Sequence, residues 1–552
     1  MGLRALTLFL ITLPLFSSES QALFLVQKGL IKEGIEQYVS YKEKAGAHDF
    51  ETLKQIGEII LDQGAFSSDP EVRLLSIYGT GIAQKSDTLT IFEAGVESRD
   101  PVTQLAAIHY LGELIDDRSS ELLARCCSSD YLGVRMEAAY HLARRKNPHA
   151  TDQIEALMYK LPPMFRVHFA EFFALIGTPK AISLLRQLMN DQELMVRSSA
   201  VMSAAQYGRD DLLSYIRALA THKNPAEQEI CALALGMLGD THQRERLEQL
   251  SKSPYENVRL AALKALYQLG ETHVQSQIIE MANKGDLFAI LLLGSIEGSE
   301  PTLEKLLSSK DRAIQFNAAL ALLQRKSPAC TLHIAEFLTS YPHELGCQPI
   351  FSTGRAQIAW SFATSSEKYA KLAQTDVLAL TLDLKYRVLQ ATLDLPQPAF
   401  LDIARSVFSA RVTPLIPPLV HLLENNKSPE AIELLKVFAN APGAPLMRGF
   451  CNLGLLRLGV EGPYEELVIK EITRLKDSEL IRFRASAPKG AKQTFTPFSL
   501  TPEETSQLLV ESYQTLASRQ EDKSIDILLK AIGEGHPKNR YALAGLLLKT
   551  LQ

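Results

Sequence analysis

The strongest constraint in this 552-residue sequence is a period of 31 residues. Counting back from Arg259 in steps of 31 reaches a long side chain with a planar donor group at every step. These anchor positions are Arg259, Gln228, Arg197, Arg166, Arg135, Gln104 and Arg73. A fixed period of about 20 to 50 residues indicates stacked repeats, in which each unit packs only against its neighbours.

The residues around each anchor repeat as well. Prolines lie three residues before four of the anchors, and glycines lie eleven residues after four of them. The prolines are Pro70, Pro101, Pro163 and Pro225, and the glycines are Gly177, Gly208, Gly239 and Gly270. Proline fits the first turn of a helix, and glycine just past the end adopts the left-handed conformation that closes it. We therefore predict two helices in each repeat, of which the second runs from the proline to the glycine, and an all-α fold without competing strands.

The second helix is clearest in the segment SPYENVRLAALKALYQLG, residues 253–270. Its apolar residues recur at helical spacing and predict one buried stripe. They are Val258, Ala261, Ala262, Ala265, Leu266 and Leu269. The pattern Asp-x-x-x-Arg, then small residues, then Leu-Gly, over about 30 residues resembles the bacterial HEAT repeat, including the variant found in phycobilin lyases. The resemblance implies an α-α superhelix, a HEAT-repeat solenoid, and it says little about function because such scaffolds host many activities.

The resemblance is strong over residues 69–270, continues with altered spacing at 310–327, and returns around Arg448 and Arg540. Between 335 and 425 the register is lost, which leaves degenerate repeats or a separate helical insert as alternatives. The predicted organisation is a signal peptide (1–22), an N-terminal helical cap (23–68), a HEAT-repeat array (69–330), degenerate repeats or an insert (331–483), a linker (484–502) and a C-terminal helical cap (503–552).

The N-terminus has the pattern of a secretory signal peptide. Arg4 precedes an apolar run from Ala5 to Phe16, and Ser20 and Ala22 are the small residues that a signal peptidase reads. We expect cleavage after Ala22 and export to the periplasm or beyond, with an uncleaved anchor or a first buried helix as the alternative. No later apolar run is long enough for a transmembrane helix, so no integral membrane segment is expected after cleavage.

Composition narrows the classes of ligand. The formal net charge is −5 and the sequence pI is about 6.2, which gives no general affinity for nucleic acid. Cys231 occupies a slot that alanine fills in other repeats, so we interpret it as a small buried hydrophobe. A disulfide between Cys330 and Cys347 stays open as an alternative. The absence of a Cys-x-x-Cys motif argues against structural zinc.

The recurring anchor predicts a structural role, because a catalytic residue is needed once and not in every repeat. Asp69, Asp100 and Asp311 lie four residues before their anchors, where a carboxylate caps the helix start; Asn224 and Glu193 occupy the same slot elsewhere. One turn later, arginine or glutamine can donate to a neighbouring cap or to loop carbonyls. We therefore interpret Arg259 as a brace.

No enzymatic motif stands out. The sequence has no P-loop, no GxSxG, no HExxH and no dinucleotide fingerprint. Iron-dependent HEAT-repeat hydroxylases carry several His-Glu pairs, whereas this chain has one, at His343-Glu344. We predict no catalytic residue, no metal ligand and no cofactor.

The best candidate for a binding surface lies on the second helices. Core residues take the offsets −1, +2, +3, +6 and +7 from the anchor, which leaves +1 and +5 facing a concave groove. Across the first three repeats these positions present apolar and aromatic side chains, which are the predicted partner-binding residues. They are Leu74, Leu105 and Met136 at +1 and Tyr78, His109 and Tyr140 at +5. Later repeats have Leu233 and Lys264 at +5 and Glu229 and Leu260 at +1.

These observations predict an exported scaffold that binds an unidentified protein partner through its concave face, without catalysis. The alternative for the strip of six residues is packing between adjacent second helices. The alternatives for function are a repeat-scaffolded enzyme or lyase-like, cofactor-handling factor with its site in 335–425, and a structural role through self-association.

Overall fold

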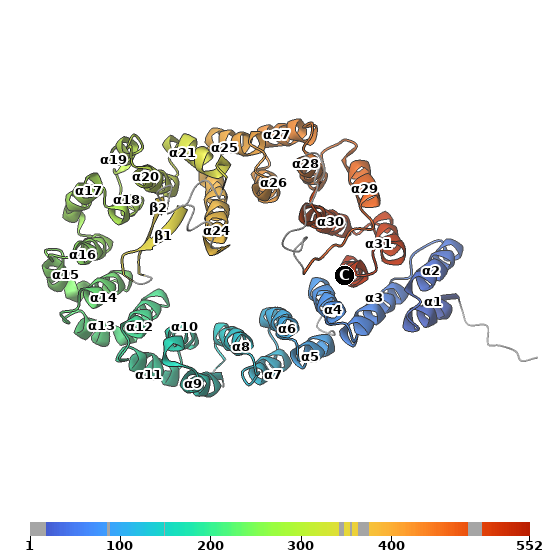
Figure 1. The fold of residues 1–552 in the computed structure, drawn as a ribbon, viewed down its shortest axis with the longest axis horizontal. Coiled ribbons are helices and arrows are strands. Elements are labelled where there is room, and N and C mark those ends of the chain that lie inside the picture. Colours follow the sequence, from blue (N-terminus) through green and yellow to red (C-terminus); the bar gives the residue numbers. More distant parts are fainter. Residues whose placement is uncertain are drawn as a thin grey trace, which may run out of the picture. The chain divides into compact units, whose positions relative to one another are not determined.

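The computed structural model describes residues 18–84, 89–147, 150–341, 347–353, 356–362, 375–483 and 500–552 (Figure 1). Its contacts divide the chain into two compact units. Unit 1 joins both ends of the chain, Met1–Leu114 and Pro463–Gln552, and unit 2 is Ile115–Gly462. Both are built from stacked helix pairs, so the predicted all-α solenoid is confirmed.

Unit 1 contains these helices: α1 (Ser18–Gln27), α2 (Ile31–Ala45), α3 (Phe50–Ala65), α4 (Pro70–Ala83), α5 (Leu89–Val96), α6 (Pro101–Glu113), α29 (Tyr464–Arg474), α30 (Pro502–Ala517), α31 (Asp522–Glu534) and α32 (Asn539–Thr550). Unit 2 contains α7 (Asp117–Cys126), α8 (Leu132–Arg144), α9 (Ala150–Lys160), α10 (Arg166–Ile176), α11 (Pro179–Leu188), α12 (Leu194–Gln206), α13 (Leu213–Leu219), α14 (Pro225–Met237), α15 (Arg244–Leu250), α16 (Glu256–Gln268), α17 (Gln275–Asn283), α18 (Leu287–Leu293), α19 (Glu300–Leu306), α20 (Arg312–Gln324), α21 (Thr331–Thr339), β1 (Cys347–Phe351), β2 (Ile358–Phe362), α24 (Thr375–Ala391), α25 (Gln397–Ser409), α26 (Ile416–Asn426), α27 (Pro429–Ala439) and α28 (Pro445–Arg457).

The predicted helix boundaries are set by the expected capping chemistry. The Asp69 carboxylate accepts the backbone N–H of Glu71 at 2.9 Å, and the Asp100 carboxylate accepts that of Thr103 at 2.8 Å. The glycines after the second helices are left-handed, with φ of 67°, 64°, 68° and 93° at Gly177, Gly208, Gly239 and Gly270. Asp311 and Asn224 cap α20 and α14, whereas Glu193 makes no side-chain cap.

The core of each repeat lies between its two helices and the next pair. Five of the six residues of the predicted stripe are buried in α16: Val258, Ala261, Ala262 and Ala265 have no exposed surface, and Leu266 is 1% exposed. The sixth, Leu269, lies just past the end of the helix and is half-buried. Small side chains in this stripe let α16 pack closely against α14. The 31-residue period therefore fixes the spacing of the stack.

Unit 1 is held together by an interface between the two ends of the chain. The last helix, α32, packs against α3 and α4. Two glycines lie at the crossing of α4 and α32, and a methyl group added to Gly545 would overlap the backbone of Gly79. Helix backbones approach this closely only where neither residue has a side chain. No periodicity in the sequence indicates this contact.

One element departs from the helical prediction. Residues 347–362 form an antiparallel hairpin in which Cys347 lies opposite Phe362 and Phe351 opposite Ile358. The sequence interpretation, which expected no competing strands, missed it. The strands are only five residues long, and α18, α20 and α24 pack on them. An isolated two-stranded hairpin is marginal in water, so this one depends on contacts that a local pattern does not contain.

Two predicted segments, the signal peptide and the linker, lie partly outside the described residues. Residues 1–17 of the predicted signal peptide lie outside, and α1 begins at Ser18, with the Ala22 side chain fully buried within the helix. Residues 484–499 of the predicted linker also lie outside; its end, Thr501, forms a capping box with Glu504 at the start of α30. Within the part of the chain that the structure describes, every helix is too short or too polar to cross a bilayer.

Candidate functional site

The recurring anchors hold the loop that precedes their own helix. The Arg259 guanidinium donates to the Ser253 carbonyl at 2.9 Å, six residues back. The same bond to the carbonyl six residues back joins Arg73 to Ser67 (2.7 Å), Arg197 to Asp191 (2.7 Å), Gln104 to Ser98 (2.7 Å) and Gln228 to His222 (2.7 Å). Arg197 also pairs with Glu227 of the next repeat at 2.6 Å. For these five anchors the geometry agrees with the brace interpretation, whereas Arg166 pairs with the Asp191 carboxylate at 2.9 Å.

In unit 1 the predicted partner-binding residues divide into two groups. Leu74 is 5% exposed on α4, the helix that packs against α32, and the Tyr78 ring stacks on Phe483 with centroids 5.8 Å apart. Leu105 is 36% exposed, and His109 is exposed beside Tyr110 with ring centroids 5.1 Å apart. The chain's own C-terminal part therefore contacts the first pair, while the second pair faces solvent.

In unit 2 the predicted residues Met136 and Tyr140 are half-buried on α8. The Tyr140 ring lies 6.2 Å from Phe172 of α10, and the Arg144 guanidinium lies 5.9 Å from the centre of the same ring. Both residues keep part of their surface in solvent.

The later repeats of unit 2 carry a bound polypeptide segment, the hairpin β1–β2. Figure 1 shows it against the row of second helices that includes α14, α16, α18 and α20. Glu229, at a predicted +1 position of α14, has no exposed surface, and its carboxylate accepts hydrogen bonds from Asn257 of α16 and from Gln357 of the hairpin, the latter at 3.4 Å. Asn257 also donates to Thr353 at 3.3 Å. The +1 side chain of α14 thus faces outward from the stack, as predicted, and binds the hairpin.

A second contact fixes the outer edge of β2. The Asn317 side chain of α20 donates to the Trp360 carbonyl at 2.7 Å and accepts the Trp360 N–H at 3.2 Å. Its amide therefore satisfies both backbone groups of one residue, as a neighbouring strand does. Next to it, the Phe362 ring lies 5.5 Å from Phe316 and 5.0 Å from the Arg312 guanidinium.

Between the hairpin and the second helices lies a hollow of about 430 Å³. It is lined by Lys264, Gln268, Phe288, Leu291, Leu292, Ser295, Gln324, Ala356, Gln357 and Ile358. Lys264 stands at a predicted +5 position, and Leu291 and Ser295 lie 31 residues after Leu260 and Lys264. The hollow is therefore built on the groove-facing positions of successive repeats, closed on one side by the hairpin.

The lining of this hollow carries charge of one sign, which is positive. Among the described residues that line it, Lys264 carries the single charge and none carries a carboxylate. Burial lowers the pKa of Lys264 below its usual 10.5. Burial raises the pKa of Glu229, which accepts a hydrogen bond from Gln357 of the lining, although the hydrogen bonds from Ser352, Asn257 and Gln357 oppose that rise.

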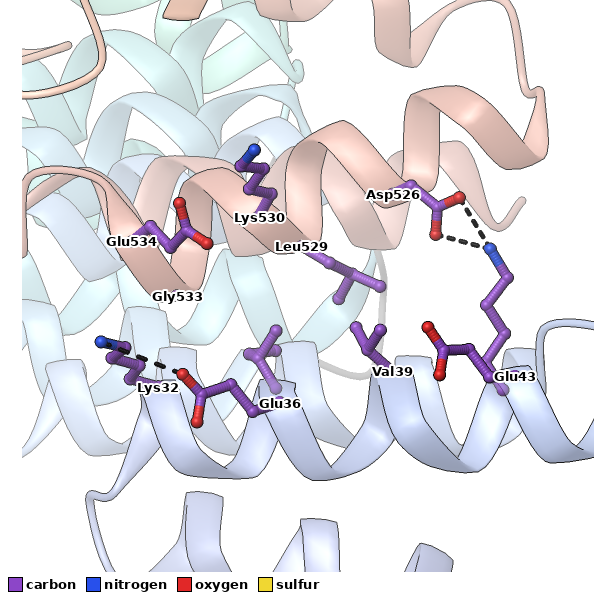
Figure 2. Close-up of a pocket in the computed structure, with 11 residues that line it drawn as sticks. Lys32, Glu36, Val39, Glu43, Asp526, Leu529, Lys530, Gly533 and Glu534 are labelled. Carbon is purple, nitrogen blue, oxygen red and sulfur yellow. Dashed lines mark hydrogen bonds and ion pairs between the residues drawn. The ribbon is translucent and has the colours of Figure 1, made fainter.

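Unit 1 has a hollow of a different kind, about 480 Å³, between α2 and α31 (Figure 2). Ile35, Val39, Leu529 and Gly533 contribute its apolar surface, and lysines and carboxylates alternate around them. The Lys42 ammonium pairs with Asp526 at 2.6 Å, and Lys32 lies 3.9 Å from Glu36. Because both signs are mixed and partly paired, this hollow has no charge preference for a ligand. We interpret it as the joint between two helices from opposite ends of the chain.

In the part of the chain that the structure describes, the remaining reactive side chains are not clustered. The six cysteines are free, five of them buried, and burial raises the pKa of the Cys126 thiol to about 11 and of the Cys347 thiol to about 12. Among the described residues, no group of three histidine, cysteine, aspartate or glutamate side chains could hold a metal ion.

Sequence reasoning identified Lys264 and Glu229 as groove-facing but missed Asn257 and Asn317. Asn317 lies two residues after the anchor Gln315, an offset that holds a buried apolar residue in four other repeats: Leu75, Ala106, Ile230 and Ala261. Its complete burial is therefore that of a polar side chain in an apolar slot. That mismatch was a readable signal for a hydrogen-bonding partner.

Residues 184–267 match the family described as HEAT repeats. The chain contains HEAT repeats. The resemblance to HEAT repeats is thereby confirmed, and the comparison with curated proteins found no match. Among solved structures, the complex of CpcE and CpcF of phycocyanin lyase from Nostoc sp. is 22% identical over 37% of this chain and 87% of that chain, with a TM-score of 0.28. Kap95p, bound to RanGDP, is 11% identical over 96% of this chain and 77% of its own, with a TM-score of 0.32. Importin beta is 11% identical over 97% and 85%, with a TM-score of 0.30.

Proposed function

We propose that this protein is an exported, non-catalytic HEAT-repeat scaffold that binds another protein through the face lined by its second helices. The observation that carries the proposal is the hairpin. Side chains of α14, α16 and α20 hold its loop and strand backbone with Glu229, Asn257 and Asn317. The face therefore already binds a polypeptide segment, and it does so with side chains at repeat-specific positions.

Each unit also has predicted partner-binding residues that keep exposed surface on a second helix. In unit 2, Met136 and Tyr140 keep exposed surface on α8, and in unit 1 Leu105 and His109 do so on α6. Aromatic and apolar side chains that stay in contact with water are typical of binding surfaces. Export rests on the N-terminal pattern around Ala22, and the absence of catalysis is inferred from the missing motifs and the buried thiols.

Site-specific photo-crosslinking tests the binding face. A photoreactive phenylalanine analogue replaces Tyr140 or His109 on second helices, and Tyr159, which is 55% exposed on the first helix α9, serves as the control position. Crosslinks from 140 and 109 to one envelope protein, with none from 159, would support the proposal. Crosslinks from 159 alone would place binding on the first helices and contradict it.

A capture experiment then measures the contribution of the predicted strip. Tagged wild type is compared with the Tyr78→Ala, His109→Ala, Tyr140→Ala triple variant after both are shown to be folded by circular dichroism. Loss of the crosslinked partner from the variant is expected. Because Tyr78 stacks on Phe483, a variant that retains Tyr78 and changes only the other two residues separates binding from packing.

A further inference from the structure

The hollow between the hairpin and helices α16, α18 and α20 has the features of a ligand site. Its volume, about 430 Å³, falls in the range of ligand pockets. Phe288, Leu291 and Leu292 form apolar walls, and Ile358 of the hairpin contributes an apolar side chain that is 46% exposed. An exposed isoleucine beside a hollow leaves apolar surface in water until something covers it.

The polar groups that line the hollow are one ammonium, three carboxamides and one hydroxyl, with no carboxylate among them. Lys264 makes no ion pair or hydrogen bond with any described residue, and burial alone lowers its pKa. Gln268 and Gln324 add carboxamides from α16 and α20, and Gln357 adds one from the hairpin. A cation that is partly removed from water and lacks a partner destabilises the free protein, so the site has a charge that a bound anion would neutralise.

The combination of one cation, several amides and apolar walls selects the class of anion. A phosphate carries about two charges and is typically met by several cationic groups, whereas a carboxylate is satisfied by one cation and a few neutral donors. We propose that this hollow binds the carboxylate of an apolar ligand, with Lys264 as its counter-ion and Phe288, Leu291 and Ile358 around its apolar part. Such a group occurs at the C-terminus of a polypeptide that ends in an apolar residue and in a free apolar carboxylic acid.

The inference deepens the proposed function and rests on it where the carboxylate is a partner's chain end. The hollow lies on the same row of second helices, on +1 and +5 positions, so a polypeptide on this face can place its end there. The Glu229 carboxylate, which accepts a hydrogen bond from Asn257, also accepts one from Gln357 at the rim of the hollow. The hairpin therefore contributes a wall of the site.

Ligand titrations on the full chain test the charge requirement. The probes are N-acetyl-leucine, which has a free carboxylate, and its uncharged amide, followed by calorimetry or by saturation-transfer NMR. The acid is expected to bind at least about 10-fold more tightly than the amide, because a charge-assisted hydrogen bond is worth more than a neutral one. Equal binding of the two, or binding of neither at millimolar concentration, would overturn the inference.

Variants assign the effect to Lys264. Lys264→Met removes the charge and keeps the length of the side chain, and it is expected to weaken acid binding about 10-fold. The matched control is Lys284→Met, which removes a lysine that is 71% exposed and paired with Glu280 at the surface; it is expected to leave binding unchanged. If Lys264→Met does not fold, Lys264→Gln keeps a donor without the charge. Unaltered acid binding by a folded Lys264 variant would contradict the assignment.

Two further arms identify the source of the carboxylate and separate the two proposals. A peptide ending in Leu with a free carboxylate is compared with hexanoate; tighter binding of the peptide indicates a chain end, and tighter binding of hexanoate a free acid. Crosslinking of the partner from position 140 is repeated in Lys264→Met. If the crosslink persists in Lys264→Met while the acid no longer binds, both proposals stand. The carboxylate that binds at Lys264 is then not the chain end of the crosslinked partner. If the crosslink is absent in wild type while the acid binds through Lys264, the proposed function fails and the carboxylate site stands.

Discussion

At the scale of single residues, arginine and glutamine have the same structural role at the anchor position. Arginine and glutamine both donate to the carbonyl six residues back, as Arg259 and Gln228 do at 2.9 and 2.7 Å. The shared function is therefore the hydrogen bond and not the charge. That explains why the period tolerates the exchange of arginine for glutamine in the natural sequence.

A pair of substitutions at Arg259 tests this equivalence. Arg259→Gln is expected to leave the free energy of unfolding within about 0.5 kcal/mol of wild type, because glutamine reaches the same carbonyl in two other repeats. Arg259→Ala leaves the Ser253 and Pro254 carbonyls without their donor, and a loss of about 1 to 2 kcal/mol is expected. Urea denaturation measures both. Equal losses in the two variants would show that the charge matters and that the brace interpretation is incomplete.

The charge of Lys264, which is proposed to bind the ligand, also lowers the stability of the ligand-free protein. Because burial lowers its pKa in the folded state, the folded protein binds this proton less tightly than the unfolded chain does. Its charge therefore destabilises the fold at neutral pH, and the penalty fades as pH rises through the folded pKa towards the unfolded value near 10.5. Lys264→Met should be more stable than wild type at pH 7, by about 1 kcal/mol, the usual size of one stabilising replacement.

Denaturation of both proteins at a series of pH values measures this effect. The advantage of Lys264→Met over wild type should shrink between neutral pH and 10.5, whereas Lys284→Met should show no such trend. A constant difference across the series would mean that the charge of Lys264 carries no penalty in the folded protein.

At the scale of elements, most helices follow from local chemistry, and the long-range contacts do not. The anchors, caps and closing glycines predicted α16 and its buried stripe, because each of these signals acts within one turn of helix. The hairpin was missed because its strands are stabilised by α18, α20 and α24. For the same reason the sequence predicted only part of the candidate site. It placed Lys264 on the groove, but Gln357 and Ile358, which form one wall, belong to the hairpin that was not predicted.

The crossing of α4 and α32 gives a sharp element-scale prediction. Gly545→Ala would drive a methyl group into the Gly79 backbone, which has no side chain to move, and a loss of about 1 to 3 kcal/mol is expected. The matched control is Gly533→Ala in α31 of the same unit, where the new methyl would meet Ile35 at an ordinary 3.6 Å. There, replacing a helical glycine should stabilise by about 0.5 to 1 kcal/mol.

Chemical denaturation compares these two variants with wild type, and limited proteolysis shows whether the C-terminal helices detach. Faster cleavage near α32 in Gly545→Ala alone is expected. Equal behaviour of the two alanine variants would show that α4 and α32 do not cross at these glycines.

At the scale of the whole molecule, unit 1 packs the first helices of the chain against the last. Cleavage near the N-terminus would therefore affect the packing of unit 1 as well as the targeting of the protein. Helix α1 begins at Ser18 and packs on α2, with Ala22 buried inside it. Cleavage after Ala22 would leave Leu23–Gln27 of α1. Val26, which is fully buried beside Gly34, would remain, so the shortened helix keeps one of its core contacts.

Processing is therefore expected to yield a folded protein that begins at Leu23, if the chain is exported as proposed. The full-length gene is expressed in a bacterial host, the envelope fraction is collected, and the N-terminus is sequenced. Ala22→Arg, which blocks the position read by a signal peptidase, should leave the longer form in the membrane fraction. An unprocessed wild type that begins at Met1 and stays with the cytoplasm would contradict export. In that case the intact α1, with Ala22 in its core, would be the native first helix of the stack, and the partner would have to be sought inside the cell.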